Sequence, residues 1–249
     1  MAYDPASLDK PLAALKAFDW GGDAAAFQPI DAAVIAAHGD AAARADLEKR
    51  LAELLGGGIS RAATEYVCRK LSLIGTAAAV PALTALLPNT DNSHMARFAL
   101  ERIAAPEAAE SLRKALGSLQ GDLRIGVISS LAGRGDAASV PLLAALLAGE
   151  SRTAVAAADA LGTIRGPEAT QALAAAAKST GDKAVAAAIV DARLACAEDL
   201  LRQGKRPEAT AIYQSLAAAA ADASSPLTKS ARLAAARGIL ACLDTSTSS

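Results

Sequence analysis

A pair of leucines recurs through the middle of the chain at a nearly constant interval. In each pair the two leucines are twelve residues apart, and successive pairs begin 29, 31 and 30 residues after one another. The pairs are Leu71 and Leu83, Leu100 and Leu112, Leu131 and Leu143, and Leu161 and Leu173. A fixed period of this length is typical of stacked repeats in which each unit is two short helices joined by a tight turn. The spacing therefore predicts an all-α protein, a right-handed α-solenoid or superhelix of about twelve antiparallel helices.

The composition agrees with a thin core made of small and branched side chains. Of the 249 residues, 53% are hydrophobic but only 3% are aromatic, whereas a conventional globular domain of this length buries more Phe, Trp and Tyr. The net charge is -1, so no overall field attracts nucleic acid or an anionic membrane. Cys68, Cys196 and Cys242 stand far apart in apolar helical segments. This placement favours buried free thiols over a disulfide framework or a metal site.

The regularity of the pattern changes twice along the chain, which predicts three parts and a tail within one continuous solenoid. The parts are irregular N-terminal capping helices at 1–59, regular repeats at 60–180, a C-terminal hairpin with a closing helix at 181–243, and the tail 244–249. Terminal repeats are expected to be irregular because one of their faces meets water. The tail has no large apolar residue, so we expect it to be disordered.

Two segments carry a family resemblance. LSLIG at 71–75 with AAAVPALTALL at 77–87, and its close copy AASVPLLAALL at 137–147, resemble the HEAT repeat in its short bacterial form. The segment ARLACAEDLLRQGKRPEATAIYQSLAAA at 192–219 is similar to a tetratricopeptide-type hairpin. Both resemblances imply an armadillo-like superhelix that offers surfaces for protein–protein interaction. They imply a scaffold or adaptor and carry over no catalytic activity.

The repeat architecture predicts which surface binds a partner. In such a stack the second helix of each unit lies in the inner, concave layer, where ligands usually bind. The polar residues predicted on that face are Thr84, Glu110, Arg113, Lys114, Gln171 and Lys178. The rest of the face is mostly alanine and proline, which suits a groove for a helix or an extended peptide rather than a catalytic pocket. Alanine is also a good helix former in its own right, so a face without a selected partner is the open alternative.

The sequence offers few groups for catalysis, and we expect neither an enzyme nor a bound cofactor or metal. His38 and His94 are the only two histidines and lie about two repeats apart, which disfavours a shared metal or proton transfer. No phosphate-binding loop, dinucleotide fingerprint or H-E-x-x-H motif is present. His94 is expected to have a local packing role beside Arg97 and Glu101, which can pair across one helical turn.

HEAT-like folds imply two enzymatic alternatives, a DNA-binding glycosylase-type enzyme and a bilin-lyase-like protein. The predicted inner face lacks the run of Lys and Arg that phosphate contact requires, and no motif supports the lyase. Trp20, the single tryptophan, is expected to anchor the first hairpin, with a contact site as the alternative.

The partner is therefore expected to be a protein or peptide, with no nucleic acid and no membrane insertion. The sequence contains no signal-peptide pattern and no charge-free apolar run of membrane-spanning length. As it stands the chain is expected to be cytoplasmic, or exported or periplasmic if a leader has been removed.

Overall fold

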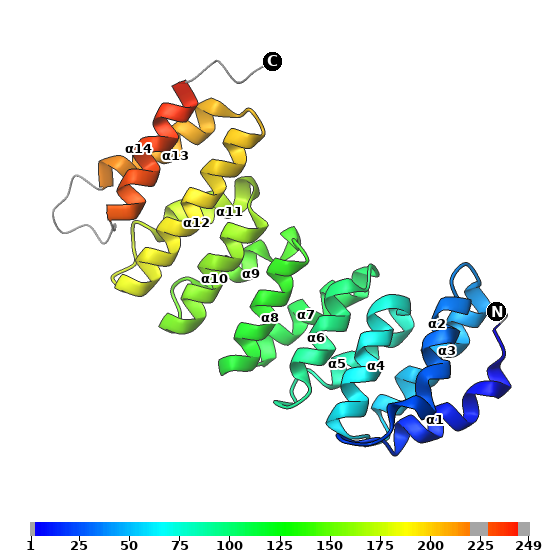
Figure 1. The fold of residues 1–249 in the computed structure, drawn as a ribbon. Coiled ribbons are helices and arrows are strands. Elements are labelled where there is room, and N and C mark those ends of the chain that lie inside the picture. The colour runs from blue at the N-terminus through cyan, green and yellow to red at the C-terminus, as the bar shows by residue number, and fades with distance from the viewer. Residues whose placement is uncertain (1–2, 220–228, 244–249) are drawn as a thin grey trace. The chain divides into compact units, whose positions relative to one another are not determined.

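The computed structural model describes residues 3–219 and 229–243, and within them every regular element is a helix (Figure 1). The described residues form fourteen α-helices and four short 3-10 helices. The chain is an all-α solenoid, as predicted. The helix count exceeds the predicted twelve because the N-terminal and C-terminal parts each contribute three helices beside the four regular pairs.

The chain divides by its contacts into two compact units, Met1–Ser130 and Leu131–Ser249. The helices of the first unit are α1 (Asp9–Lys16), α2 (Gln28–Ala36), α3 (Ala41–Leu55), α4 (Arg61–Ile74), α5 (Val80–Ala85), α6 (Ser93–Arg102), α7 (Pro106–Ser118) and most of α8 (Gly121–Gly133). Its 3-10 helices are η1 (Pro5–Leu8), η2 (Ala24–Phe27) and η3 (Ala77–Ala79). Helix α4 packs against α6, while α5 packs against both α3 and α7. First and second helices of successive repeats therefore form two separate layers.

The second unit repeats this arrangement. Its helices are α9 (Val140–Leu146), α10 (Ser151–Ile164), α11 (Gly166–Ala176), α12 (Lys183–Arg202), α13 (Arg206–Ala219) and α14 (Lys229–Leu243), and η4 (Ala137–Ser139) precedes α9. Helix α10 packs along α12, and α9 packs against α11. Helix α14 contacts both α12 and α13 (Figure 1). The predicted C-terminal hairpin is thus α12 and α13, with α14 as the closing helix.

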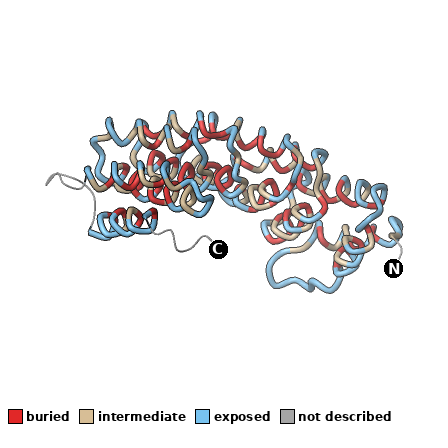
Figure 2. The backbone as a smooth tube through the Cα atoms, turned by 90° about the horizontal axis from the view of Figure 1, so that it is seen from above, coloured by how far each residue is buried: buried red, intermediate tan, exposed pale blue. Residues whose placement is uncertain are grey.

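The leucine pairs form the core of both units. All eight leucines of the repeat pattern have an exposed fraction of 0%, which confirms the predicted register. Figure 2 shows the buried residues on the sides of the helices that face one another, with exposed residues on the outer sides and in the turns. Since a buried Leu contributes about 1.5–3 kcal/mol relative to an exposed one, these pairs are the main apolar contribution of each repeat.

Small residues allow the first helices of the second unit to approach closely. A Cβ atom on Gly162 of α10 would lie 2.7 Å from the Cα atom of Ala192 on α12, so the two backbones touch there. The turn that follows α10 is also tight, because Arg165 has a φ of 64°. Its guanidinium donates to the Gly162 carbonyl at 3.2 Å and to Asp199 at 3.1 Å. These bonds hold the left-handed residue in place.

Two serines of a type that often caps helices lie one residue inside the helices that they begin. Ser93 and Ser151 are the first residues of α6 and α10 rather than the caps that precede them. The position before α10 is taken by Glu150, whose carboxylate accepts from the amides of Arg152 and Thr153. A carboxylate near the positive end of the helix dipole caps a helix as well as a hydroxyl does. A serine beside it is therefore not needed as the cap.

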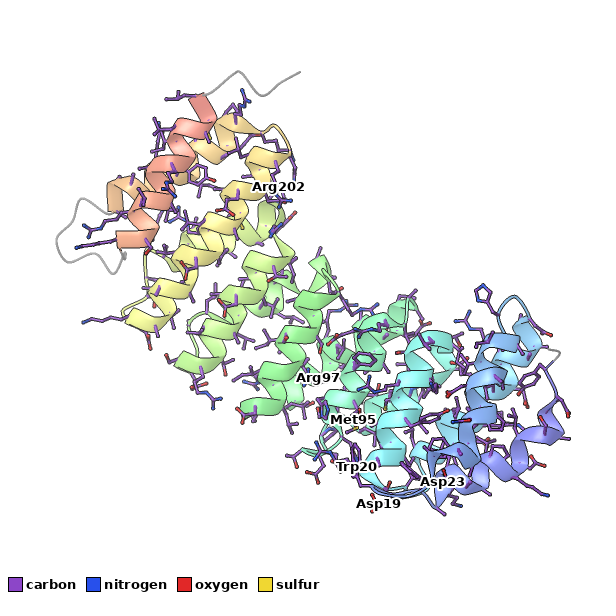
Figure 3. All side chains as sticks on the ribbon, viewed as in Figure 1. Asp19, Trp20, Asp23, Met95, Arg97 and Arg202 are labelled. Atoms are coloured by element: carbon purple, nitrogen blue, oxygen red, sulfur yellow. The ribbon has the colours of Figure 1, made fainter. Side chains whose placement is uncertain are left out.

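The predicted role of Trp20 is also wrong. Its side chain is 75% exposed, at the turn between Asp19 and Asp23 (Figure 3). The N-terminal hairpin is held instead by edge-to-face contacts of Phe27 with Phe18 and with Tyr66, each with ring centroids 4.8 Å apart. Smaller rings fit between α2 and α4, and the tryptophan remains outside.

Two further predictions can be compared with the described residues. All three cysteines are buried and free, as expected. Among the helices of the described ranges, none has the length and apolar character needed to cross a bilayer. The predicted tail 244–249 and the start of the closing helix at 226–228 lie outside the described residues, and the part boundaries at 59 and 180 stay predictions.

Candidate functional site

A groove of about 650 Å³ lies between α5 and α7, two neighbouring second helices of the first unit. We call it the α5/α7 groove. Its lining residues are Val80, Pro81, Thr84, Leu87 and Pro88 on one wall and Glu107, Glu110, Ser111, Lys114, Ala115, Ser118 and Leu119 on the other. A volume of this size lies in the range of known ligand sites. The groove is therefore large enough for several side chains of a bound segment.

The α5 wall is positioned by a buried carboxylate from α3. Glu48 is only 2% exposed, and one of its oxygens accepts from the amide of Thr76 at 2.6 Å and from the amide of Ala79 at 3.0 Å. The Thr76 hydroxyl lies 2.9 Å from the other carboxylate oxygen. Because these residues immediately precede α5, Glu48 caps the helix from the neighbouring repeat.

The floor of the groove is apolar and well packed. Val80 and Leu87 are 5% and 1% exposed, and Ala115 and Leu119 are each 8% exposed. These side chains belong to the core between the two helix layers, so the floor is fixed by the same packing that holds the repeat together.

The rim carries one ion pair. The ammonium of Lys114 lies 2.7 Å from the Glu110 carboxylate, one helical turn away, and both side chains are more than half exposed. The hydrogen bond from Lys114 lowers the pKa of Glu110 below its ordinary value. The two charges compensate each other, and an exposed pair of this kind contributes little to stability. A binding partner can exchange this pair for its own charges at little expense.

The hydroxyls of the groove already have acceptors. Thr84 donates to the Val80 carbonyl at 2.7 Å, Ser111 to Ala108 at 2.9 Å, and Ser118 to Ala115 at 3.3 Å. The lining contains neither histidine nor cysteine. A hydroxyl nucleophile needs a neighbouring base within hydrogen-bond reach, and here each hydroxyl serves its own helix. The groove is therefore suited to binding by apolar contact and shape complementarity.

The structure brings three of the six predicted site residues together. Thr84, Glu110 and Lys114 line the α5/α7 groove. Arg113 is half-buried at the side of α7 and does not line it. Gln171 and Lys178 belong to the second unit, where both are exposed. The prediction that all six act as binding residues stays a prediction.

The second unit contains two further hollows on its own second helices. One, of about 560 Å³, lies between α9 and α11, and its lining includes Ala144, Ala148 and Ala175 as well as Asp182. The other, of about 530 Å³, lies between α11, α12 and α13 and includes Gln171 and the buried Cys196. Lys178 lines neither of them. The first is the equivalent of the α5/α7 groove, with Asp182 as the one charged residue of its lining.

His94 lies at a much smaller hollow between α4 and α6. This hollow measures about 70 Å³, and its lining includes Cys68 and Glu65, so it has room for only about two water molecules. Burial raises the pKa of the Cys68 thiol to about 12, which keeps it protonated and unreactive at neutral pH. Within residues 3–219 and 229–243, no three His, Cys, Asp or Glu side chains gather as metal ligands would.

Sequence reasoning missed the floor and one end of the groove. Glu107, Ser111 and Ser118 line it together with Lys114, and these four residues are separated by intervals of four, three and four. Residues at this spacing lie on one face of a helix, so this stripe could have been recognised in the sequence. Leu87 and Leu119 carry no such signal, because an apolar residue at a helix end is typical of any core.

Comparison with known proteins places part of the chain in a repeat family. Residues 109–194, which run from α7 into α12, match the sequence profile of HEAT repeats. The resemblance predicted from AASVPLLAALL at 137–147 lies inside this match. The resemblance predicted from residues 71–87 lies outside it and stays a prediction, as does the bacterial origin. None of the curated proteins compared with the sequence is significantly similar to it.

Two solved structures match this chain at low sequence identity. The crystal structure of an engineered protein is 20% identical, covers 86% of this chain and 96% of its own, and has a TM-score of 0.41. Human deoxyhypusine hydroxylase in complex with glycerol is 17% identical, with coverage of 96% of both chains and a TM-score of 0.35.

Proposed function

We propose that the protein is a non-catalytic scaffold or adaptor that binds a helix or an extended segment of a partner protein in the α5/α7 groove. The observation that supports this most is the groove itself, with an apolar floor, hydroxyls that already have acceptors, and a rim on which Lys114 pairs with Glu110 beside a further acid, Glu107. Such a surface gains free energy by burying apolar side chains of a partner and has few polar groups to leave unsatisfied.

A blocking substitution tests this proposal. Ser118 is exposed at the groove wall, so Ser118→Trp would fill the groove without entering the core. Leu73→Trp is the matched control, because Leu73 is 67% exposed on α4, in the layer of first helices. Both variants should fold like the unaltered protein, which circular dichroism checks.

The measurement is affinity capture from native lysate followed by mass spectrometry. We expect a protein partner that is retained by the unaltered protein and by Leu73→Trp and is lost with Ser118→Trp. Equal capture by all three proteins would place binding elsewhere and overturn the assignment to this groove. Capture of nucleic acid that weakens steeply with added salt would favour the glycosylase-type alternative, and retention of a coloured tetrapyrrole would favour the lyase.

A further inference from the structure

Helix α14 exposes an apolar stripe on its outer side. The stripe consists of Leu233, Ala236, Leu240 and Leu243, at intervals of three, four and three residues. Leu233, Leu240 and Leu243 are 53%, 66% and 70% exposed. The opposite side of α14 carries the buried residues of this helix and packs on α12 and α13 (Figure 1). The stripe is thus a second apolar face that this unit leaves open.

The charged side chains of α14 itself have one sign. At 3.6 residues per turn, Arg232 projects along one edge of the stripe and Arg237 along the other. Lys229 begins the helix, and the sequence of α14 contains no Asp or Glu. Within the described residues, neither arginine forms an ion pair. An apolar stripe with a cation on each flank is the pattern of one helix in a coiled-coil pair whose partner carries acids at the flanking positions.

We infer that the α14 stripe binds an amphipathic helix of a partner protein whose apolar face is flanked by Glu or Asp. The intervals of three and four let the leucines interdigitate with a facing helix. The two arginines would then pair with acids along both edges and set the partner's identity and orientation. This surface is in the second unit and does not depend on the function proposed for the α5/α7 groove.

Other occupants fit the charges and shape less well. In a dimer formed through this face, Arg232 and Arg237 would lie against the same two arginines of the second copy, because a two-fold interface repeats one patch on both sides. Residues 244–249 read DTSTSS and contain no apolar side chain that could cover the leucines. An anionic membrane is a less suitable partner, because the stripe lacks the aromatic side chains that are typical of interfacial helices.

The test uses a designed peptide as the probe. The peptide has three heptads with Leu at positions a and d and Glu at e and g, and a matched peptide has Lys at e and g. Glutamates on the first peptide repel one another, so it does not pair with itself. Each peptide carries a fluorescent label, and its binding to the intact protein is measured by fluorescence anisotropy over a range of salt concentrations.

The inference predicts that the Glu peptide binds, that its affinity falls as salt rises, and that the Lys peptide does not bind. Leu240→Ser should weaken binding by about tenfold. The double variant Arg232→Glu/Arg237→Glu should reverse the preference between the two peptides. Arg61→Glu, at an exposed position of α4, is the control and should bind like the unaltered protein. All substituted side chains are exposed, and circular dichroism confirms that each variant is folded.

Three results would overturn the inference. The first is equal binding, or no binding, of the two peptides. The second is a dimer in sedimentation velocity that Leu240→Ser dissociates, which would assign the stripe to a second copy. The third is binding to phosphatidylserine vesicles that the arginine variants abolish while peptide binding is unchanged, which would assign it to a membrane.

Discussion

Substitution of Glu48 gives the sharpest test of how the groove wall is held. The carboxylate is 2% exposed and accepts hydrogen bonds from two backbone amides, those of Thr76 and Ala79, and from the Thr76 hydroxyl. In Glu48→Ala both amides lose this acceptor. Each buried donor left unsatisfied costs about 1–3 kcal/mol. The amide of Thr76 is only partly buried, so water can replace part of its bond, and the amide of Ala79 also donates to the Thr76 carbonyl at 3.3 Å. We therefore expect a loss of about 2 kcal/mol in the free energy of unfolding.

Urea unfolding followed by far-UV circular dichroism measures this loss. Fluorescence is a poor probe of the core, because the single tryptophan, Trp20, is 75% exposed. With the slopes usual for proteins of this size, the midpoint should fall by roughly 1–2 M urea. Glu48→Gln keeps one acceptor oxygen and should lose about half as much. Glu53→Ala on the same helix is the control, because Glu53 is exposed and pairs only with Lys49 at 4.0 Å, and it should change stability by less than about 0.5 kcal/mol.

Hydrogen exchange distinguishes a local effect from a global one. In Glu48→Ala the amides of Thr76 and Ala79 should lose protection before those of α7. If Glu48→Ala were as stable as Glu53→Ala, or if both amides kept their protection, the cross-repeat cap would have no energetic role and the reasoning would be refuted.

Three other predictions follow from buried groups. Leu112→Asp places a carboxylate at a 0% exposed position and should unfold the neighbouring repeats, so a folded and equally stable variant would contradict the register. Gly126→Ala puts a Cβ atom 2.6 Å from the Arg97 guanidinium carbon, so the guanidinium must move and lose its bonds to the Gly126 carbonyl and the Ser130 hydroxyl. This variant should lose about 1–2 kcal/mol in urea unfolding; Gly133→Ala, with nothing within 4 Å, should lose nothing. Burial raises the pKa of the Cys68 thiol from 9.0 to about 12. The contribution of this thiol to stability should therefore be constant below about pH 8 and fall as pH rises through 9 toward 12, because the unfolded chain releases this proton first; a Cys68→Ala variant with the same alkaline loss would contradict this.

The fold could be predicted because it repeats. Each leucine of the pattern is supported by its equivalents one repeat away, and so the register of all eight could be assigned without knowledge of any contact. Features that occur once were missed for the same reason. Glu48 reads as an ordinary polar residue of an amphipathic helix, and its partners Thr76 and Ala79 are 28 and 31 residues away. Trp20 was expected inside on the basis of residue type alone, which does not say whether neighbouring rings leave space for it.

The candidate site was predicted only where it follows from helical geometry. Thr84, Glu110 and Lys114 come together because equivalent positions of adjacent second helices face the same groove. Arg113 is one residue from Lys114, which rotates it by about 100° around the helix axis and away from the groove. Lys178 follows the end of α11 at Ala176, so helical projection no longer fixes its direction.

Site-specific photo-crosslinking tests the central claim most directly. A benzoylphenylalanine placed at Thr84, in the α5/α7 groove, is compared in cells with the same group placed at Leu73, on the layer of first helices. The account predicts that one partner protein is crosslinked from Thr84 and not from Leu73, and that Ser118→Trp abolishes the product. A partner crosslinked from Leu73 alone, or equally from both positions, would show that the second-helix groove is not the binding surface.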